Sequence, residues 1–144
     1  MASCRSGFLP KILQLTSEQV RILRKEARDK YPVEACALLF GRFAKEKVVV
    51  TKIVIAPNTL QSTTRFQIDP QLVFDSFEQA EQEGLRFIGL FHSHPAPHSP
   101  SAEDIRYMKL WGDAIWLILS LTDDSIAAFH MVNVKVQRIR IIIE

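Results

Sequence analysis

Residues 92–104 read HSHPAPHSPSAED and join an apolar segment to a polar segment that favours a helix. The residues before this junction, RFIGLFH from Arg86 to His92, are typical of a buried strand. Pro95 ends that strand, because proline interrupts a strand ladder. After the proline-rich loop, Ser101 is predicted to open a helix that ends near Gly112. The segment therefore predicts a strand–loop–helix unit with several polar side chains at its junction.

Three side chains of this unit form a candidate metal site. Because side chains alternate along a strand, His92 and His94 point to one face, where two imidazole nitrogens can reach one metal ion. Asp104 falls in the first turn of the predicted helix, and the short loop can bring its carboxylate beside them. Two histidines and one aspartate leave the fourth position of a tetrahedral zinc ion for water, as in catalytic sites. Zinc lowers the pKa of such a water from about 15.7 to near 7.

Two further residues fit the chemistry of a metal hydrolase. Ser101 is placed to donate a hydrogen bond to the charge that develops on an attacked carbonyl oxygen. Glu34 precedes the apolar run 35–40, where burial can tune a general base. Each has a plainer interpretation: Ser101 and Asp104 as a helix-capping pair, and Glu34 as a solvated charge. Capping and metal binding are compatible, because the cap would hold Asp104 while its other oxygen meets the metal.

The rest of the chain predicts an α/β fold with one mixed, curved sheet flanked by about three helices. The first helix begins at Ser17 and is stopped by Pro32, and the second runs from Asp69 and Pro70 to Gly84. Other strands are expected at 35–41, 48–56, 65–68, 114–121, 125–132 and 134–143. We expect a flexible N-terminus over residues 1–10 and one domain over residues 11–144.

Composition argues against several function classes. The formal net charge of +2 gives no strong field for nucleic acid. No apolar run approaches the roughly 18 residues of a membrane span. The two cysteines, Cys4 and Cys36, do not make a disulfide framework, which favours a reducing compartment. We therefore expect a soluble, cytoplasmic protein that binds neither nucleic acid nor membrane.

The candidate residues together resemble the motif of the JAMM (MPN-plus) metallopeptidases. That motif is a glutamate, then His-Ser/Thr-His-Pro, then Ser-x-x-Asp; here Glu34 is followed by His92-Ser93-His94-Pro95 and Ser101-Ala102-Glu103-Asp104. The order of predicted elements is similar to that family over most of the chain. One spacing departs from the family pattern, since six residues, 95–100, separate His94 from Ser101 instead of seven.

The resemblance implies an MPN/JAMM-type domain with one Zn²⁺ per chain, held by His92, His94 and Asp104. It implies that Glu34 takes a proton from the attacking water and passes it to the leaving amine, while Ser101 stabilises the developing charge. It also implies cleavage of isopeptide or peptide bonds at the C-terminus of ubiquitin-like modifier proteins. The chain has no room for the long insertions of eukaryotic members, so it looks like the minimal archaeal or bacterial form.

We expect the modifier, or its conjugates, to be the partner. Its tail would lie extended beside an open sheet edge, with residues 58–68, including Arg65, as one wall of a groove.

Cys36 shares a face with Glu34 if the strand begins there, which makes it a candidate neighbour of the metal ligands. His98 is expected in solvent. The sequence leaves open whether the protein is a monomer or a homodimer.

Two other function classes compete with the peptidase. A non-catalytic MPN-type scaffold is disfavoured because every expected ligand is present. A two-histidine, one-carboxylate set also holds iron in oxygenases, but those sites usually lie in all-β barrels. Zinc deaminases need a Pro-Cys-x-x-Cys motif that this chain lacks.

Overall fold

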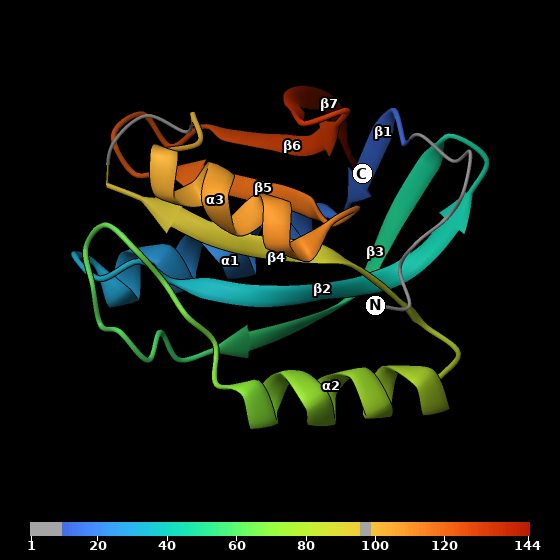
Figure 1. The fold of residues 1–144 in the computed structure, drawn as a ribbon, viewed down its shortest axis with the longest axis horizontal. Helices are drawn as coiled ribbons and strands as arrows, with labels where there is room; N and C mark the ends of the chain where they lie inside the picture. The colour runs from blue at the N-terminus through green and yellow to red at the C-terminus, as the bar shows by residue number, and fades with distance from the viewer. Residues whose placement is uncertain (1–9, 96–98) are drawn as a thin grey trace.

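In the computed structural model, which describes residues 10–95 and 99–144, seven strands close into a barrel (Figure 1). Their order around the barrel is β1-β3-β2-β4-β5-β6-β7. Strand β1 is parallel to β3 and β7, and β4 is parallel to β5, while the other pairs are antiparallel, so the sheet is mixed as predicted. The strands are β1 (Ile12–Leu15), β2 (Cys36–Ala44), β3 (Lys47–Ala56), β4 (Arg86–His94), β5 (Ile115–Ser120), β6 (Ile126–Val132) and β7 (Lys135–Ile143).

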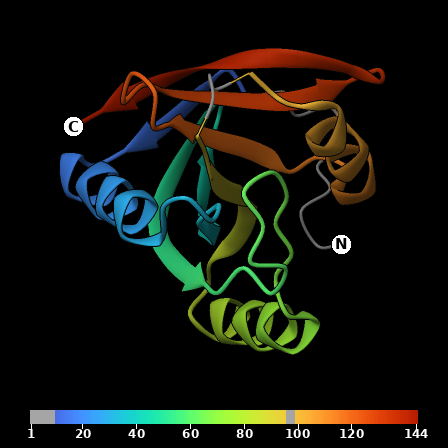
Figure 2. The same cartoon turned by 90° about the vertical axis from the view of Figure 1, so that its left-hand side faces the viewer.

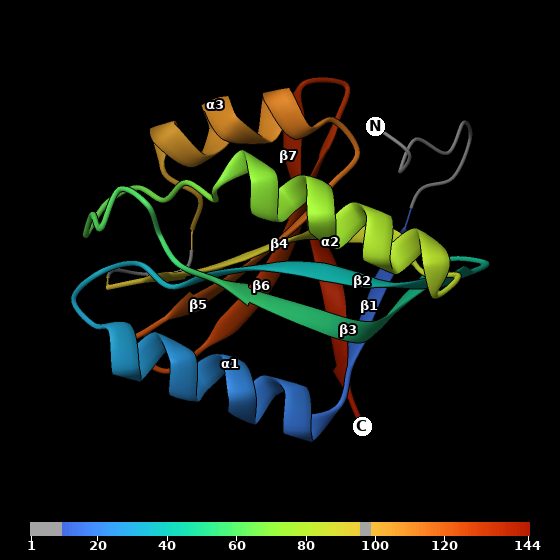
Figure 3. The same ribbon diagram turned by 90° about the horizontal axis from the view of Figure 1, so that it is seen from below.

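The three helices of the described residues are α1 (Ser17–Lys30), α2 (Pro70–Gln82) and α3 (Ala102–Trp111). Helix α1 lies on one side of the sheet, and α2 and α3 lie on the other (Figure 3). Each begins at a polar cap: Thr16 for α1, Asp69 for α2 and Ser101 for α3. The predicted starts of α2 and α3 are confirmed. No helix in the described ranges has the length and apolar character needed to cross a membrane.

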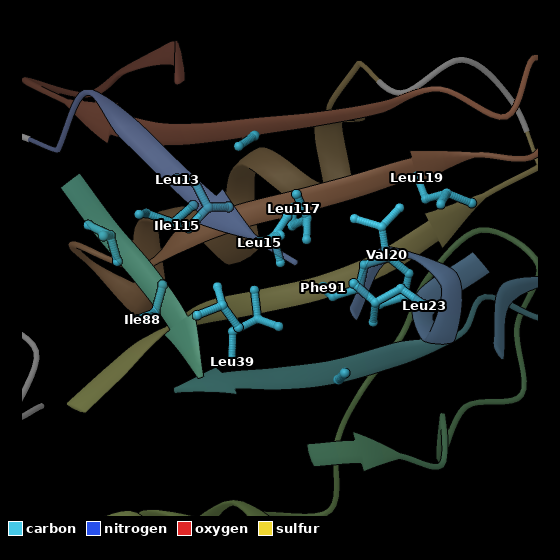
Figure 4. Close-up of a cluster of buried hydrophobic side chains, with 14 of the residues drawn as sticks. Leu13, Leu15, Val20, Leu23, Leu39, Ile88, Phe91, Ile115, Leu117 and Leu119 are labelled. Atoms are coloured by element: carbon cyan, nitrogen blue, oxygen red, sulfur yellow. The ribbon is translucent and has the colours of Figure 1, made fainter. Parts of the chain in front are cut away.

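Alternation along the strands divides the apolar side chains between two clusters. One fills the barrel beneath α1 and includes Leu13, Leu39 and Phe91 (Figure 4). The other, which includes Leu38, Leu90 and Trp116, packs against residues of α2 and α3. Because His92 lies two residues after Leu90, the same alternation turns its side chain toward the cluster with α2 and α3. Both histidines are thus directed to the face of the sheet that α2 and α3 cover.

The structure corrects three expectations. Strand β1 was not predicted, because four residues carry too little pattern to identify a strand. The strand expected at 65–68 is wrong: this segment is irregular, and its Arg65 carbonyl and Gln67 amide bond the side chain of Asn58 instead. The expected open sheet edge is not found beside the histidines, because β4 pairs with β2 on one side and with β5 on the other.

Two parts of the sequence-based interpretation lie outside the described residues. Residues 1–9 of the expected flexible N-terminus and the loop residues 96–98, which include His98, belong to this part of the chain. The domain boundary at residue 11 stays a prediction.

Candidate metal centre

The two histidines lie at the end of β4, where the strand runs toward the N-terminus of α3 (Figure 1). Their Nε2 atoms are 3.1 Å apart. His92 is fully buried and His94 is 6% exposed. Burial lowers the pKa of His92, which favours the neutral imidazole that binds metals. The predicted convergence of the two rings on one face is confirmed.

Asp104 is held beside the histidines by the first turn of α3. A capping box fixes it: the Asp104 amide donates to Ser101 Oγ at 3.0 Å, and the Ser101 amide donates to Asp104 Oδ2 at 2.9 Å. The same Oδ2 atom is 2.9 Å from His94 Nε2, and Oδ1 is 3.2 Å from His92 Nε2. The cap therefore orients the carboxylate while it faces both rings, so the capping interpretation is confirmed and is compatible with metal binding by Asp104.

These three side chains meet the requirements of a metal site. Their donor atoms all lie within 4.8 Å of one another, and all three residues are buried. Burial alone would raise the pKa of Asp104, but its hydrogen bonds with His92 and His94 outweigh burial and hold that pKa well below its usual range. An ionised carboxylate and two imidazoles that converge on one point form the mixed oxygen and nitrogen donor set that suits zinc. A cation between them would also explain why two ring nitrogens lie so close together.

Glu34 reaches the same centre from the turn that precedes β2. Its Oε2 atom is 4.0 Å from His94 Nε2, and the residue is only 2% exposed. Among the described residues, its other oxygen, Oε1, has no hydrogen-bond partner. Burial, opposed by the nearby His94, raises the pKa of Glu34 to about 8. Glu34 is therefore a buried carboxylate rather than a solvated charge, with a pKa suited to proton transfer near neutral pH.

The raised pKa predicts how the stability of the metal-free protein depends on pH. A carboxyl group whose pKa is raised on folding contributes stability that is fully present below its ordinary pKa of 4.5 and lost as the pH rises through about 8. We expect urea unfolding at pH 5 to 9 to show this loss in the wild type and a flatter profile in Glu34→Gln. The exposed Glu81→Gln variant serves as the control and should keep the wild-type profile. A Glu34→Gln profile as steep as that of the wild type would contradict the assignment.

Aromatic side chains surround His92 on the side of the sheet that faces α3. Phe66 stacks on His92 with ring centroids 4.8 Å apart and an interplanar angle of 22°. Tyr107 of α3 and Trp116 of β5 meet Phe66 edge-on. The sequence interpretation missed the role of Phe66. Its only signal was an apolar residue within the expected strand 65–68, which does not identify the ring that Phe66 contacts.

Cys36 lies opposite His92 in the β2–β4 ladder, as the alternation of β2 requires. Its thiol, however, contacts the carbonyl of Ala56 at 3.5 Å, and burial raises its pKa to about 12. The thiol is not among the donor atoms that converge on one point. Cys36 therefore packs behind the site and is not part of the donor set.

A cleft of about 420 Å³ opens beside Asp104, between α3 and the irregular segment 58–68. Figure 2 shows this segment crossing the same end of the molecule as α3. Exposed apolar residues lie at the rim, with Leu110 77% exposed and Leu60 41% exposed. An ion pair of 3.9 Å between Arg65 and Glu103 joins the two walls. The lining residues are Leu60, Arg65, Phe66, Gln67, Glu103, Asp104, Arg106, Tyr107 and Leu110.

Known proteins resemble this chain over nearly its whole length. Residues 16–138 match the family described as prokaryotic homologs of the JAB domain. The chain is 33% identical over 144 residues to a desampylase from Pyrococcus furiosus, which covers 99% of both chains. It is 29% identical over 105 residues to a probable TtuB-protein conjugate cleaving protease from Thermus thermophilus, covering 72% of this chain and 68% of that one. A solution structure of a protein from Desulfitobacterium hafniense has a TM-score of 0.83 and 31% identity, covering 92% of each chain.

Proposed function

Because the chain belongs to the family of prokaryotic homologs of the JAB domain, we propose that it is a zinc-dependent hydrolase that releases ubiquitin-like modifier proteins. The bond cut is the isopeptide or peptide bond at the modifier's C-terminus, in conjugates or in precursors. The observation that carries the proposal is the convergence of His92, His94 and Asp104 with Glu34 placed 4.0 Å from His94. Two relatives whose names describe a desampylase and a conjugate-cleaving protease support the choice of substrate.

Each residue has one task in the proposed reaction. His92, His94 and Asp104 hold one Zn²⁺, which when bound supplies a Lewis acid that makes water nucleophilic near neutral pH. Glu34 takes the proton of the attacking water on its carboxylate and returns it to the nitrogen of the leaving amine. The Ser101 hydroxyl accepts a hydrogen bond from the Asp104 amide, so its own proton is left to donate to the developing charge on the carbonyl oxygen.

The cleft beside Asp104 is the proposed binding site for the modifier tail. An extended tail would lie along segment 58–68, which forms one wall of this cleft. This choice of the loop rather than a strand edge is supported by β4, which carries both histidines and has a partner strand on each side. The exposed Leu60 and Leu110 suit apolar side chains of the tail.

The free, buried Cys36 fits a cytoplasmic location.

Arg65→Ala tests the assignment of the cleft. Removing the guanidinium takes away a contact to the tail that would be made equally before and during the reaction, so we expect KM to rise several-fold while kcat stays within about 2-fold. Zinc content should stay at that of the wild type. The matched control is Lys109→Ala, because Lys109 is exposed on α3 but does not line the cleft. Unchanged KM in Arg65→Ala would remove Arg65 from the tail site.

The proposed function itself is tested with the zinc-loaded protein and a prokaryotic ubiquitin-like modifier in two forms. One form is joined to a lysine side chain through an isopeptide bond, and the other is a linear fusion. Release of the intact modifier, with its mass ending at the C-terminal residue, supports the proposal. Stoichiometric zinc with no cleavage of either form contradicts the hydrolase and favours a scaffold of the same fold.

A further inference from the structure

Asn58 stands out because its buried side chain uses all of its hydrogen-bonding capacity. The residue is only 8% exposed. Its Nδ2 atom donates to the carbonyl oxygens of Glu34 at 3.1 Å and Arg65 at 2.9 Å. Its Oδ1 atom accepts from the amides of Leu60 at 3.1 Å and Gln67 at 3.2 Å. The hydrogen-bonding groups of the amide are thus all paired, and the amide holds Glu34 just beyond the last β2–β3 pair, which is Cys36 with Ala56.

One of these segments is the main chain of Glu34. Its carbonyl accepts from Asn58, and its amide donates to the carbonyl of Ser62 at 2.9 Å. The amide of Ala35 donates to Ser93 Oγ at 2.8 Å. Glu34 precedes β2, so the ladder of the sheet does not hold it. Its own amide and carbonyl both bond segment 58–68, while the amide of the next residue bonds β4.

The other segment is the wall of the cleft. Asn58 bonds Arg65 and Gln67, and Phe66 between them stacks on His92. A single amide therefore ties three parts of the site together: the main chain of Glu34, the residues that line the cleft, and the ring that packs on a candidate metal ligand.

We infer that Asn58 is a positioning residue for Glu34, and that it acts by fixing the backbone from which the carboxylate reaches the reacting water. The inference rests on the proposed function. A glutamate side chain has three rotatable bonds, so a small backbone displacement becomes a larger displacement of the carboxylate. Proton transfer requires heavy atoms at about 2.6–3.2 Å, and a misplacement of about 1 Å can cost about 100-fold in rate.

Asn58→Ala tests the inference through a split between kcat and KM. We expect kcat to fall about 10- to 100-fold, with KM changed less than about 3-fold and one zinc retained per chain. The matched control is Gln19→Ala, because Gln19 Nε2 of α1 donates to the Val50 carbonyl at 2.9 Å and Gln19 does not line the cleft. That variant should keep the wild-type kcat. Assays are run well below the melting temperature of every variant, so that loss of folded protein does not enter kcat.

A second variant covers the outcome in which Asn58→Ala does not fold. Asn58→Asp keeps acceptors for Leu60 and Gln67 but has no donor for the Glu34 carbonyl. We expect it to lose kcat at least as strongly as Asn58→Ala does, since a carboxylate oxygen would then face that carbonyl. A folded Asn58→Asp with wild-type kcat overturns the inference.

A double-mutant cycle shows whether the effect passes through Glu34. In Glu34→Gln, followed over long incubations, adding Asn58→Ala should change the remaining turnover by less than about 3-fold. A further loss equal to that seen in the wild-type background means that Asn58 acts elsewhere and overturns the inference. A wild type that binds zinc but has no activity contradicts both the proposed function and the inference that rests on it. An active wild type with unchanged kcat in Asn58→Ala contradicts only the role of Asn58.

Discussion

Glu34→Ala should retain about one zinc per chain and lose about 10²- to 10⁴-fold in kcat, the range expected when a general acid/base is removed. The carboxylate lies 4.0 Å from His94 Nε2 but is not one of the three converging donors, so its loss leaves the donor set intact. Its burial provides the raised pKa that a proton carrier needs near neutral pH. Elemental analysis and turnover of the modifier conjugate are measured on the same preparation.

Glu34→Gln separates the charge of this residue from its shape. The amide fills nearly the same volume but cannot take a proton, so it should be nearly as inactive as the alanine variant. The exposed Glu46→Ala is the control for the loss of one surface carboxylate and should keep full activity. Near-wild-type turnover in Glu34→Ala would mean that another group accepts the proton.

Asp104→Ala should lose stoichiometric zinc, and with it all detectable turnover. Asp104 supplies the only carboxylate among the three converging donors, and its pKa is held low, so it is ionised at any working pH. Elemental analysis after dialysis measures the loss directly. Addition of zinc should raise the melting temperature of the wild type but not that of the variant, because only a protein that binds the ion is stabilised by it.

The control for Asp104→Ala must account for damage to the helix, since Asp104 also belongs to the capping box of α3. Asp69→Ala is suitable, because Asp69 caps α2 through the amide of Gln71 and lies outside the donor set. Both variants should lose about 0.5–2 kcal/mol of folding stability from the cap. Only Asp104→Ala should lose zinc. Wild-type zinc affinity in Asp104→Ala would contradict the metal assignment.

The sequence predicted the parts of the site that depend on local pattern. Alternation along one strand sufficed to place His92 and His94 on one face. The capping pair of Ser101 and Asp104, which are three positions apart, sufficed to place Asp104 in the first turn of the helix. Only six residues, 95–100, separate His94 from the capping serine, so Asp104 has to lie close to the two histidines. Glu34 is 58 residues from His92 along the chain. Its prediction rested on its position before the apolar run 35–40 and on the family motif, and neither gives its distance from the histidines.

The features that were missed depend on contacts between distant residues. Whether four residues at 12–15 form a strand is decided by their partners in β3 and β7, which the sequence does not specify. Segment 65–68 has strand-like residues, but the side chain of Asn58 satisfies its backbone and removes the need for a neighbouring strand. The stacking of Phe66 on His92 likewise joins two segments whose approach only the fold determines.

The pairing of β1 with β7 has a consequence for the order of events during synthesis. Residues 12–15 align with residues 140–143, and the Glu144 amide bonds the Leu15 carbonyl at 2.9 Å. Among the described strands, β1 is synthesised first and β7 last, so the ring of strands can be complete only after β7 has been made. Until then β1 has only β3 as a neighbour, and its other edge is open to other nascent chains. Pairing residues 12–15 with residues 140–143 closes a long loop, and the entropy cost of this closure makes completion of the ring a late step in folding.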